Sequence, residues 1–85
     1  METRIALVGI IIEDLTAATA VNTVLHDYAD RIVGRMGIPY RKRKISIISI
    51  ALDAPQNTIS SLAGKIGSLK GVSVKTAYSG VVSTE

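Results

Sequence analysis

The 85-residue sequence contains no cysteine, no tryptophan and no phenylalanine. The absence of cysteine excludes disulfide bonds, thiolate zinc sites, iron–sulfur ligation and cysteine nucleophiles. Aromatic platforms on which nucleic-acid bases stack are also scarce, because only three tyrosines are present. The first apolar run, residues 5–12, is too short to span a bilayer, and no small-residue cleavage site follows it. We therefore expect a cytoplasmic protein that has no membrane segment.

Catalytic and metal-binding patterns are equally scarce. His26 is the only histidine, so no pair of histidines at metal-ligand spacing exists, and we expect its side chain to be solvated. Four acidic residues fit a helix cap and a solvated helix end better than they fit a metal cluster: Glu13, Asp14, Asp27 and Asp30. No paired acid and base, and no nucleophile beside a base, is visible. The sequence predicts no catalytic residue, no metal site and no cofactor.

The hydrophobic pattern predicts one domain, residues 1–85, in the order βαββαβ. The expected strands cover residues 4–13, 31–40, 45–53 and 72–80, and the expected helices cover residues 15–29 and 57–70. The first and third strands are apolar on both faces, which indicates central, buried positions. In the second strand, alternation places Ile32 and Met36 on one face and Arg35 on the other. Pro39 cannot donate a ladder hydrogen bond, so this strand belongs at a sheet edge.

Cap residues mark the ends of the two expected helices. Asp14 and Asn57 are suitable N-caps, and Gly71 occupies the position of a left-handed C-cap. Gly64 and Gly67 lie inside the second helix, where each costs about 1 kcal/mol of helix propensity. Either another backbone packs close to these glycines or the cost is tolerated, and the sequence leaves both explanations open.

These elements predict a ferredoxin-like sandwich of the α+β class, similar to ACT domains. Its four-stranded antiparallel sheet has the order 4-1-3-2, and its two helices cover one face. The other face then exposes roughly four to six large aliphatic side chains, each forgoing about 1.5–3 kcal/mol of burial free energy. Exposed patches of this kind mark protein interfaces. We therefore expect a homodimer or homotetramer, assembled through the open sheet face, a sheet edge or both.

The positive charge is concentrated in the run Arg41, Lys42, Arg43 and Lys44, within a chain of formal net charge +3. One interpretation is a charged hairpin tip that improves solubility and protects a sheet edge. The other is a basic patch, formed together with Arg31 and Arg35, that contacts nucleic-acid phosphates or a partner protein. Both interpretations stay open, and the sequence does not decide whether the chain binds DNA directly.

Three segments carry a family resemblance: METRIALVGIIIED at the amino terminus, VNTVLHDYADRIVGRMGIPYRKRKISIISIALDA over residues 21–54, and NTISSLAGKIGSLKGVSVKT over residues 57–76. The chain resembles the iron-only hydrogenase system regulators over nearly its whole length, most specifically in the third segment. That family is similar in fold to ACT domains and to the carboxy-terminal sensor domain of nickel-responsive regulators. The resemblance implies a non-enzymatic, oligomeric regulator, of transcription or of maturation, with a hydrogenase-system protein as partner.

Two departures limit what this resemblance implies. Nickel-responsive sensors bind metal through histidines and a cysteine around the second strand and the following hairpin, and residues 35–44 contain neither. They also carry a separate DNA-binding segment, which we do not expect here. Action through a partner protein is therefore at least as plausible as direct operator recognition.

The similarity to ACT domains implies a small-molecule site at a subunit interface. ACT domains bind amino acids there, often with a glycine in the first strand–helix loop, whereas residues 12–16 contain none. The nearest polar candidates are Glu13, Asp14 and Thr16. A sensor of amino acids or other metabolites is the alternative function, and a small enzyme on the same fold is disfavoured.

Overall fold

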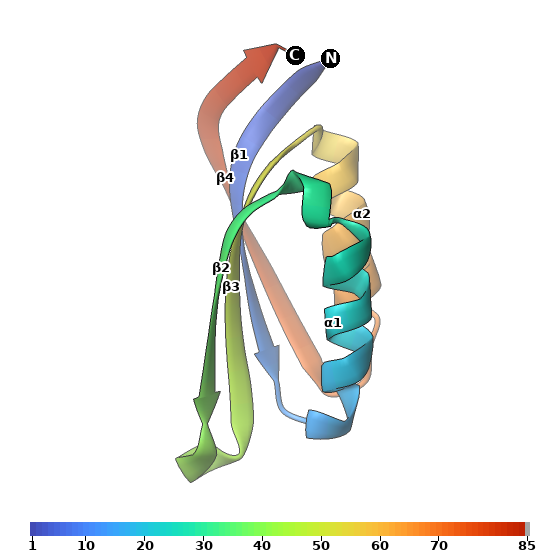
Figure 1. Ribbon diagram of the computed structural model, residues 1–85, viewed down its shortest axis with the longest axis vertical. Coiled ribbons are helices and arrows are strands. Elements are labelled where there is room, and N and C mark those ends of the chain that lie inside the picture. Colours follow the sequence, from blue (N-terminus) through green and yellow to red (C-terminus); the bar gives the residue numbers. More distant parts are fainter. Residues whose placement is uncertain (85) are drawn as a thin grey trace.

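The computed structural model describes residues 1–84. The elements are, in order, β1 (Glu2–Ile12), η1 (Leu15–Ala17), α1 (Ala18–Asp27), η2 (Ala29–Arg31), β2 (Ile32–Tyr40), η3 (Arg41–Arg43), β3 (Ile45–Ala54), α2 (Gln56–Gly67) and β4 (Val72–Thr84). The strands form one antiparallel sheet in the order β2-β3-β1-β4. Both helices lie on the same side of that sheet (Figure 1). The predicted ferredoxin-like arrangement is confirmed.

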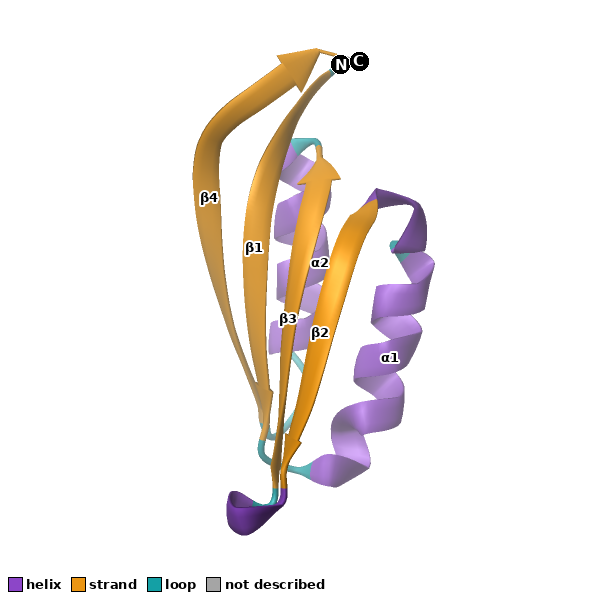
Figure 2. Ribbon diagram, turned by 60° about the vertical axis from the view of Figure 1, so that its left-hand side comes forward, coloured by secondary structure: helices purple, strands orange, loops and turns teal. Residues whose placement is uncertain are grey.

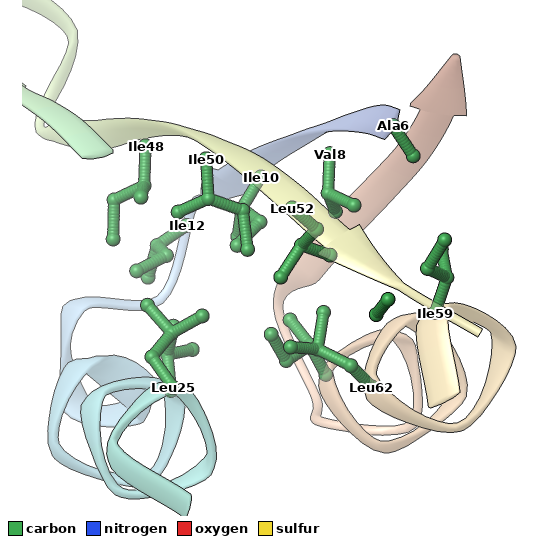
Figure 3. Packing of buried hydrophobic residues seen from close by; sticks show 13 residues of the cluster. Ala6, Val8, Ile10, Ile12, Leu25, Ile48, Ile50, Leu52, Ile59 and Leu62 are labelled. Atoms are coloured by element: carbon green, nitrogen blue, oxygen red, sulfur yellow. The ribbon is translucent and has the colours of Figure 1, made fainter. Parts of the chain in front are cut away.

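The core lies between the two central strands and the helices. Strands β1 and β3 pair from Arg4–Ala54 to Ile12–Ser46, and alternate side chains of each strand point toward the helices (Figure 3). They meet one apolar stripe from each helix, in a cluster formed by Ala6, Val8, Ile10, Ile12, Val21, Leu25, Ile48, Ile50, Leu52, Ala54, Ile59, Leu62 and Ile66. Burying each of the larger side chains contributes about 1.5–3 kcal/mol, so this single cluster is the main source of stability.

The beginning of α2 differs from the sequence-based prediction. Its N-cap is Pro55, which makes no side-chain cap hydrogen bond. The backbone N–H groups of Thr58 and Ile59 donate to the Pro55 carbonyl at 3.0 and 3.1 Å. Asn57 is therefore inside the first turn, and its predicted role as N-cap is wrong. Proline suits the capping position because the N–H that it lacks is not needed there.

A β-bulge at Val33 changes which face of the sheet the β2 side chains occupy. Ile32 and Arg35 both pair with residues of β3 that are buried under the helices. Directly paired residues point to the same face, so Ile32 and Arg35 lie on the helix side and Met36 lies on the other side. The predicted grouping of Ile32 with Met36 is wrong, because the extra residue of a bulge reverses the phase of the alternation.

Gly71 holds the α2–β4 turn against the end of β1. Its φ is +77°, so the predicted left-handed conformation is confirmed, although α2 itself ends earlier, at Gly67. The Gly71 carbonyl accepts hydrogen bonds from the backbone N–H groups of Glu13 at 2.7 Å and Asp14 at 3.2 Å. A Cβ at position 71 would clash with the Cβ of Asp14. Glycine is thus required here both by the backbone conformation and by the close approach.

We expect Gly71→Ala to lower the free energy of unfolding by about 2 kcal/mol or more, because alanine adds left-handed strain and a steric clash. Gly64→Ala is the matched control, since no neighbouring atom lies within 4 Å of a Cβ there. Because this space is empty, close packing of another backbone is not the reason for glycine at position 64. Gly64→Ala should raise stability by about 0.5–1 kcal/mol through helix propensity. Urea unfolding measures the free energy of unfolding of both variants. An equal change in the two variants would contradict the prediction.

Candidate functional site

The side of the sheet opposite the helices is apolar, and no helix covers it (Figure 2). We call this surface the open face. Its large apolar side chains are Ile5, Leu7 and Ile11 of β1, Met36, Ile38 and Tyr40 of β2, and Ile45 and Ile47 of β3. Leu7 is 53% exposed and Met36 is 55% exposed. These side chains come from three neighbouring strands, and the row of Gly9 and Ser49 lies between Leu7 and the paired Ile11 and Ile47.

The loop after β1 contains the three residues expected to form a small-molecule site, and the structure separates them. The Asp14 Oδ1 atom accepts hydrogen bonds from the Thr16 backbone N–H at 3.0 Å and from the Thr16 hydroxyl at 2.6 Å. Asp14 is thereby the N-cap of η1, as predicted. The hydroxyl bond first, and then the backbone bond, lowers the pKa of the Asp14 carboxyl below its ordinary value. Asp14 and Thr16 bind each other, and the exposed Glu13 lies outside this pair.

Glu13 lines a cavity of about 430 Å³, together with Ile11, Arg43 and Ile45. Both isoleucines belong to the open face, so this cavity lies at the hairpin end of that surface. This cavity brings together Glu13, from the predicted small-molecule site, and Arg43, from the predicted basic patch. A carboxylate and a guanidinium above an apolar floor complement the ammonium and carboxylate groups of a zwitterion.

The basic run forms the tip of the β2–β3 hairpin. Residues Arg41–Arg43 make the turn η3, and Lys44 follows with a φ of +55°. All four side chains are exposed, and the hairpin tip projects away from the helices (Figure 1, light green). Only Arg43 lines the cavity beside Glu13. The structure therefore divides the predicted patch between one cavity residue and three residues of an exposed turn.

A second cavity, which the sequence-based reasoning missed, lies on the helix side between α1 and β2. It has a volume of about 300 Å³ and is lined by Asn22, Leu25, His26, Ala29, Ile32 and Arg35. His26 is exposed, as expected, but it forms a wall of this groove. The spacing of Asn22 and His26, four residues apart on one helix face, was the available signal. Arg35 was placed away from Ile32 because the bulge is not visible in the sequence.

The two helices are joined by a polar contact at the end of α1. The Tyr28 and Ser61 hydroxyls lie 3.0 Å apart, and the Lys65 ammonium lies 5.1 Å from the centre of the Tyr28 ring. Hydrogen bonds from Ser61 and then Lys65 lower the pKa of Tyr28. The same tyrosine packs against the hydrophobic core. This contact holds α1 beside α2.

Residues 1–84 contain neither a metal-binding cluster nor a membrane-spanning helix. No group of three or more His, Asp or Glu side chains in this part of the chain is placed to hold a metal ion. No helix within the same residues has both the length and the apolar character needed to cross a membrane.

We expect the Asp14 cap to make stability depend on pH in the acid range. Because folding lowers this pKa, the stabilisation is complete above the ordinary value of about 3.9 and is lost as pH falls through the lower, folded value. Asp14→Asn keeps an oxygen acceptor that does not titrate, so its free energy of unfolding should fall less steeply with acidification. Urea unfolding at several pH values measures this. Thr16→Ala should give an intermediate slope, and identical curves for all three proteins would contradict the assignment.

Comparison with known proteins identifies the family. Residues 4–76 match the TM1266-like family, described as "Iron-only hydrogenase system regulator, putative". The structure of the uncharacterized protein TM1266 from Thermotoga maritima superposes with a TM-score of 0.86 at 34% sequence identity, covering 89% of this chain and 96% of that chain. A search of curated proteins finds no match.

A more distant structure shares the fold alone. A formyltetrahydrofolate deformylase from Pseudomonas putida KT2440 superposes with a TM-score of 0.61 at 11% identity. The match covers 86% of this chain but only 28% of the deformylase, so it corresponds to a minor part of that enzyme. The family match and the TM1266 structure agree over most of the sequence. The chain belongs to the TM1266-like family of iron-only hydrogenase system regulators, as its sequence resemblance predicted.

Proposed function

We propose that this chain is a non-enzymatic regulator of the iron-only hydrogenase system and that it acts as a homo-oligomer assembled through the open face. The family description supports the link to the hydrogenase. The single observation that supports the assembly is the open face, where large apolar side chains of three neighbouring strands have no covering helix.

The size of the open face supports an interface between copies. Stable protein interfaces bury about 800 Å² on each partner, which is roughly 15% of the 5337 Å² accessible surface of this chain. The molecule measures 42 × 19 × 17 Å, so one long face offers an area of about this size. Leu7, Met36, Ile38 and Tyr40 are each 40–55% exposed. Their burial would supply the hydrophobic free energy for association.

The distribution of charge favours a second copy as the partner. Glu13 and Asp53 lie at opposite ends of the open face, Arg43 lies beside Glu13, and Lys75 lies on the edge strand β4. An apolar centre surrounded by polar groups is the usual organisation of a protein interface. A rim that carries both acidic and basic groups can pair with the same rim of a second copy across a two-fold axis. Each acidic group can then meet a basic group of the other copy.

The cavity beside Glu13 favours the sensor as a second candidate function. A second copy on the open face would cover this cavity, so that a bound molecule would lie at the subunit interface. A cavity lined by Glu13 and Arg43 as well as Ile11 and Ile45 suits a small amino acid. In this version Asp14 and Thr16 hold the loop, and Glu13 alone of the three candidates contacts the ligand.

The basic turn formed by Arg41, Lys42, Arg43 and Lys44 remains a predicted contact for phosphates or for an acidic hydrogenase-system protein. It lies at the hairpin tip, and most of it is outside the open face. A partner that contacts Arg41, Lys42 and Lys44, outside the cavity lined by Arg43, therefore leaves the open face available for self-association. This separation supports a regulator that assembles and contacts its target at the same time.

We expect the wild-type chain to sediment as a dimer or tetramer at micromolar concentration and Leu7→Glu to shift it toward monomer. A buried, unpaired carboxylate at the centre of an apolar interface is strongly unfavourable. Leu15→Glu is the matched control, because Leu15 is 52% exposed against 53% for Leu7 but lies outside the open face, in η1. Sedimentation velocity measures the three proteins, and native mass spectrometry after purification without oxygen reports any retained ligand.

The same variants test the regulatory role in cells. Deletion of the gene in its host should change hydrogenase activity or hydrogenase transcript level, the Leu15→Glu chain should restore the wild-type level, and the Leu7→Glu chain should not. A monomeric wild-type protein would contradict the assembly. An unchanged hydrogenase in the deletion strain would contradict the regulatory role.

For the sensor, we expect amino acids to raise the melting temperature of the wild-type protein, because a ligand that binds the native state stabilises it by RT ln(1 + [L]/Kd). Glu13→Gln should abolish the shift produced by the same compounds, and Asp30→Asn, a change of equal charge in η2, should not. A broad panel of amino acids and metabolites that produces no shift would exclude this candidate while leaving the assembly untouched.

A further inference from the structure

The groove between α1 and β2 has the construction of a small-ligand site. Its volume of about 300 Å³ is at the lower end of the range found for such pockets. Leu25, which is 1% exposed, forms the floor together with Ala29 and Ile32. The walls are polar and come from both elements, with Asn22 and His26 on α1 and Arg35 on β2.

The β-bulge creates this groove. Because the bulge turns Arg35 to the helix side opposite Ile50, β2 presents a guanidinium where unbroken alternation would have placed Gly34. Beyond Arg35, the next helix-facing position of β2 is Gly37, which has no side chain to fill the space. The groove is therefore open beside the Arg35 guanidinium.

Asn22 fixes the orientation of that cation. The Asn22 Nδ2 group donates to the Ala18 carbonyl at 3.0 Å, which directs its Oδ1 atom away from the helix axis. That oxygen accepts a hydrogen bond from an Arg35 guanidinium nitrogen at 3.0 Å. A guanidinium has five N–H donors in a planar fork, so this contact leaves donors that can form a bidentate pair with a carboxylate.

We propose that the groove binds a small monocarboxylate with a short aliphatic body. The Arg35 guanidinium pairs with the carboxylate, Asn22 positions the guanidinium, and the floor of Leu25, Ala29 and Ile32 receives the aliphatic part. A phosphate suits the groove less well. The groove lies along the carboxy-terminal half of α1, where the helix dipole is negative and disfavours a doubly charged anion. The apolar floor also offers a phosphate oxygen no donor.

This inference does not depend on the open face. Arg35 lies on the opposite side of the sheet from Met36, so the groove is present in a single copy of the chain. Binding in the groove and association between copies are therefore measured separately.

The test is an NMR titration of the uniformly labelled full chain with sodium 3-methylbutanoate. Its neutral isostere 3-methylbutanamide and inorganic phosphate serve as comparison probes. We expect saturable shifts at Leu25, Ala29, Ile32 and the Arg35 side chain with the carboxylate, and weaker or no saturation with the amide and with phosphate. Shifts that centre on Ile11, Glu13 and Ile45 instead, or no saturable shift with the carboxylate, would overturn the proposal.

Two variants and one control make the assignment specific. Arg35→Gln keeps a polar N–H donor but removes the charge and the guanidinium fork, and it should raise the Kd for 3-methylbutanoate by about tenfold or more, as expected for the loss of a charge-assisted pair. Ala29→Leu should abolish binding by filling the floor without changing any charge. Arg43→Gln, in the other cavity, should leave the Kd unchanged. Equal affinity in the wild type, Arg35→Gln and Ala29→Leu would refute the proposal, whatever the oligomeric state.

Discussion

Two helices are too few to cover both faces of a four-stranded sheet, and this constraint governs the rest of the molecule. Strands β1 and β3 are apolar on both faces, yet only one face receives α1 and α2. The covered face becomes the core. The other face keeps Leu7, Met36 and their neighbours in contact with solvent. The surplus of apolar residues in the central strands thus serves stability on one side and, in our proposal, assembly on the other.

The loop after β1 shows how the fold limits where a ligand can bind. Its first two backbone N–H groups donate to Gly71, and Asp14 and Thr16 bind each other. Polar groups that already have partners offer little to a ligand, because any new contact must first replace an existing one. Polar groups that can still accept a ligand lie instead at Glu13 and Arg43, and at Arg35, whose guanidinium has N–H donors beyond the one bonded to Asn22.

The sequence was sufficient for the strand order because each strand carries its own positional signal. Runs of apolar residues on both faces indicated the two central strands. Pro39 and its neighbouring glycines indicated an edge strand. Gly71 was also recognisable, since a left-handed position after a helix strongly favours glycine. These signals are local. They depend on the residue itself and on its immediate neighbours.

The incorrect predictions concern features that depend on pairing. The bulge at Val33 exists only in the register between β2 and β3, so no periodicity within β2 reveals it. Its consequence, the helix-side position of Arg35, could not be predicted either. Asn57 has the right chemistry for a cap, but Pro55 already supplies the first helical carbonyl. The two cavities combine residues from distant parts of the chain, and only the folded structure brings those parts together.

The alternation within β2 has a mechanical consequence. Arg35 and Met36 are adjacent in the chain, about 3.8 Å apart at their Cα atoms, yet one borders the groove and the other belongs to the open face. A displacement of β2 that narrows the groove must also move the open face. If such a displacement changes the affinity between copies, assembly must change the affinity of the groove by the same factor, because coupling between two binding events is reciprocal. In that case a single edge strand would couple the two surfaces through the thickness of one sheet.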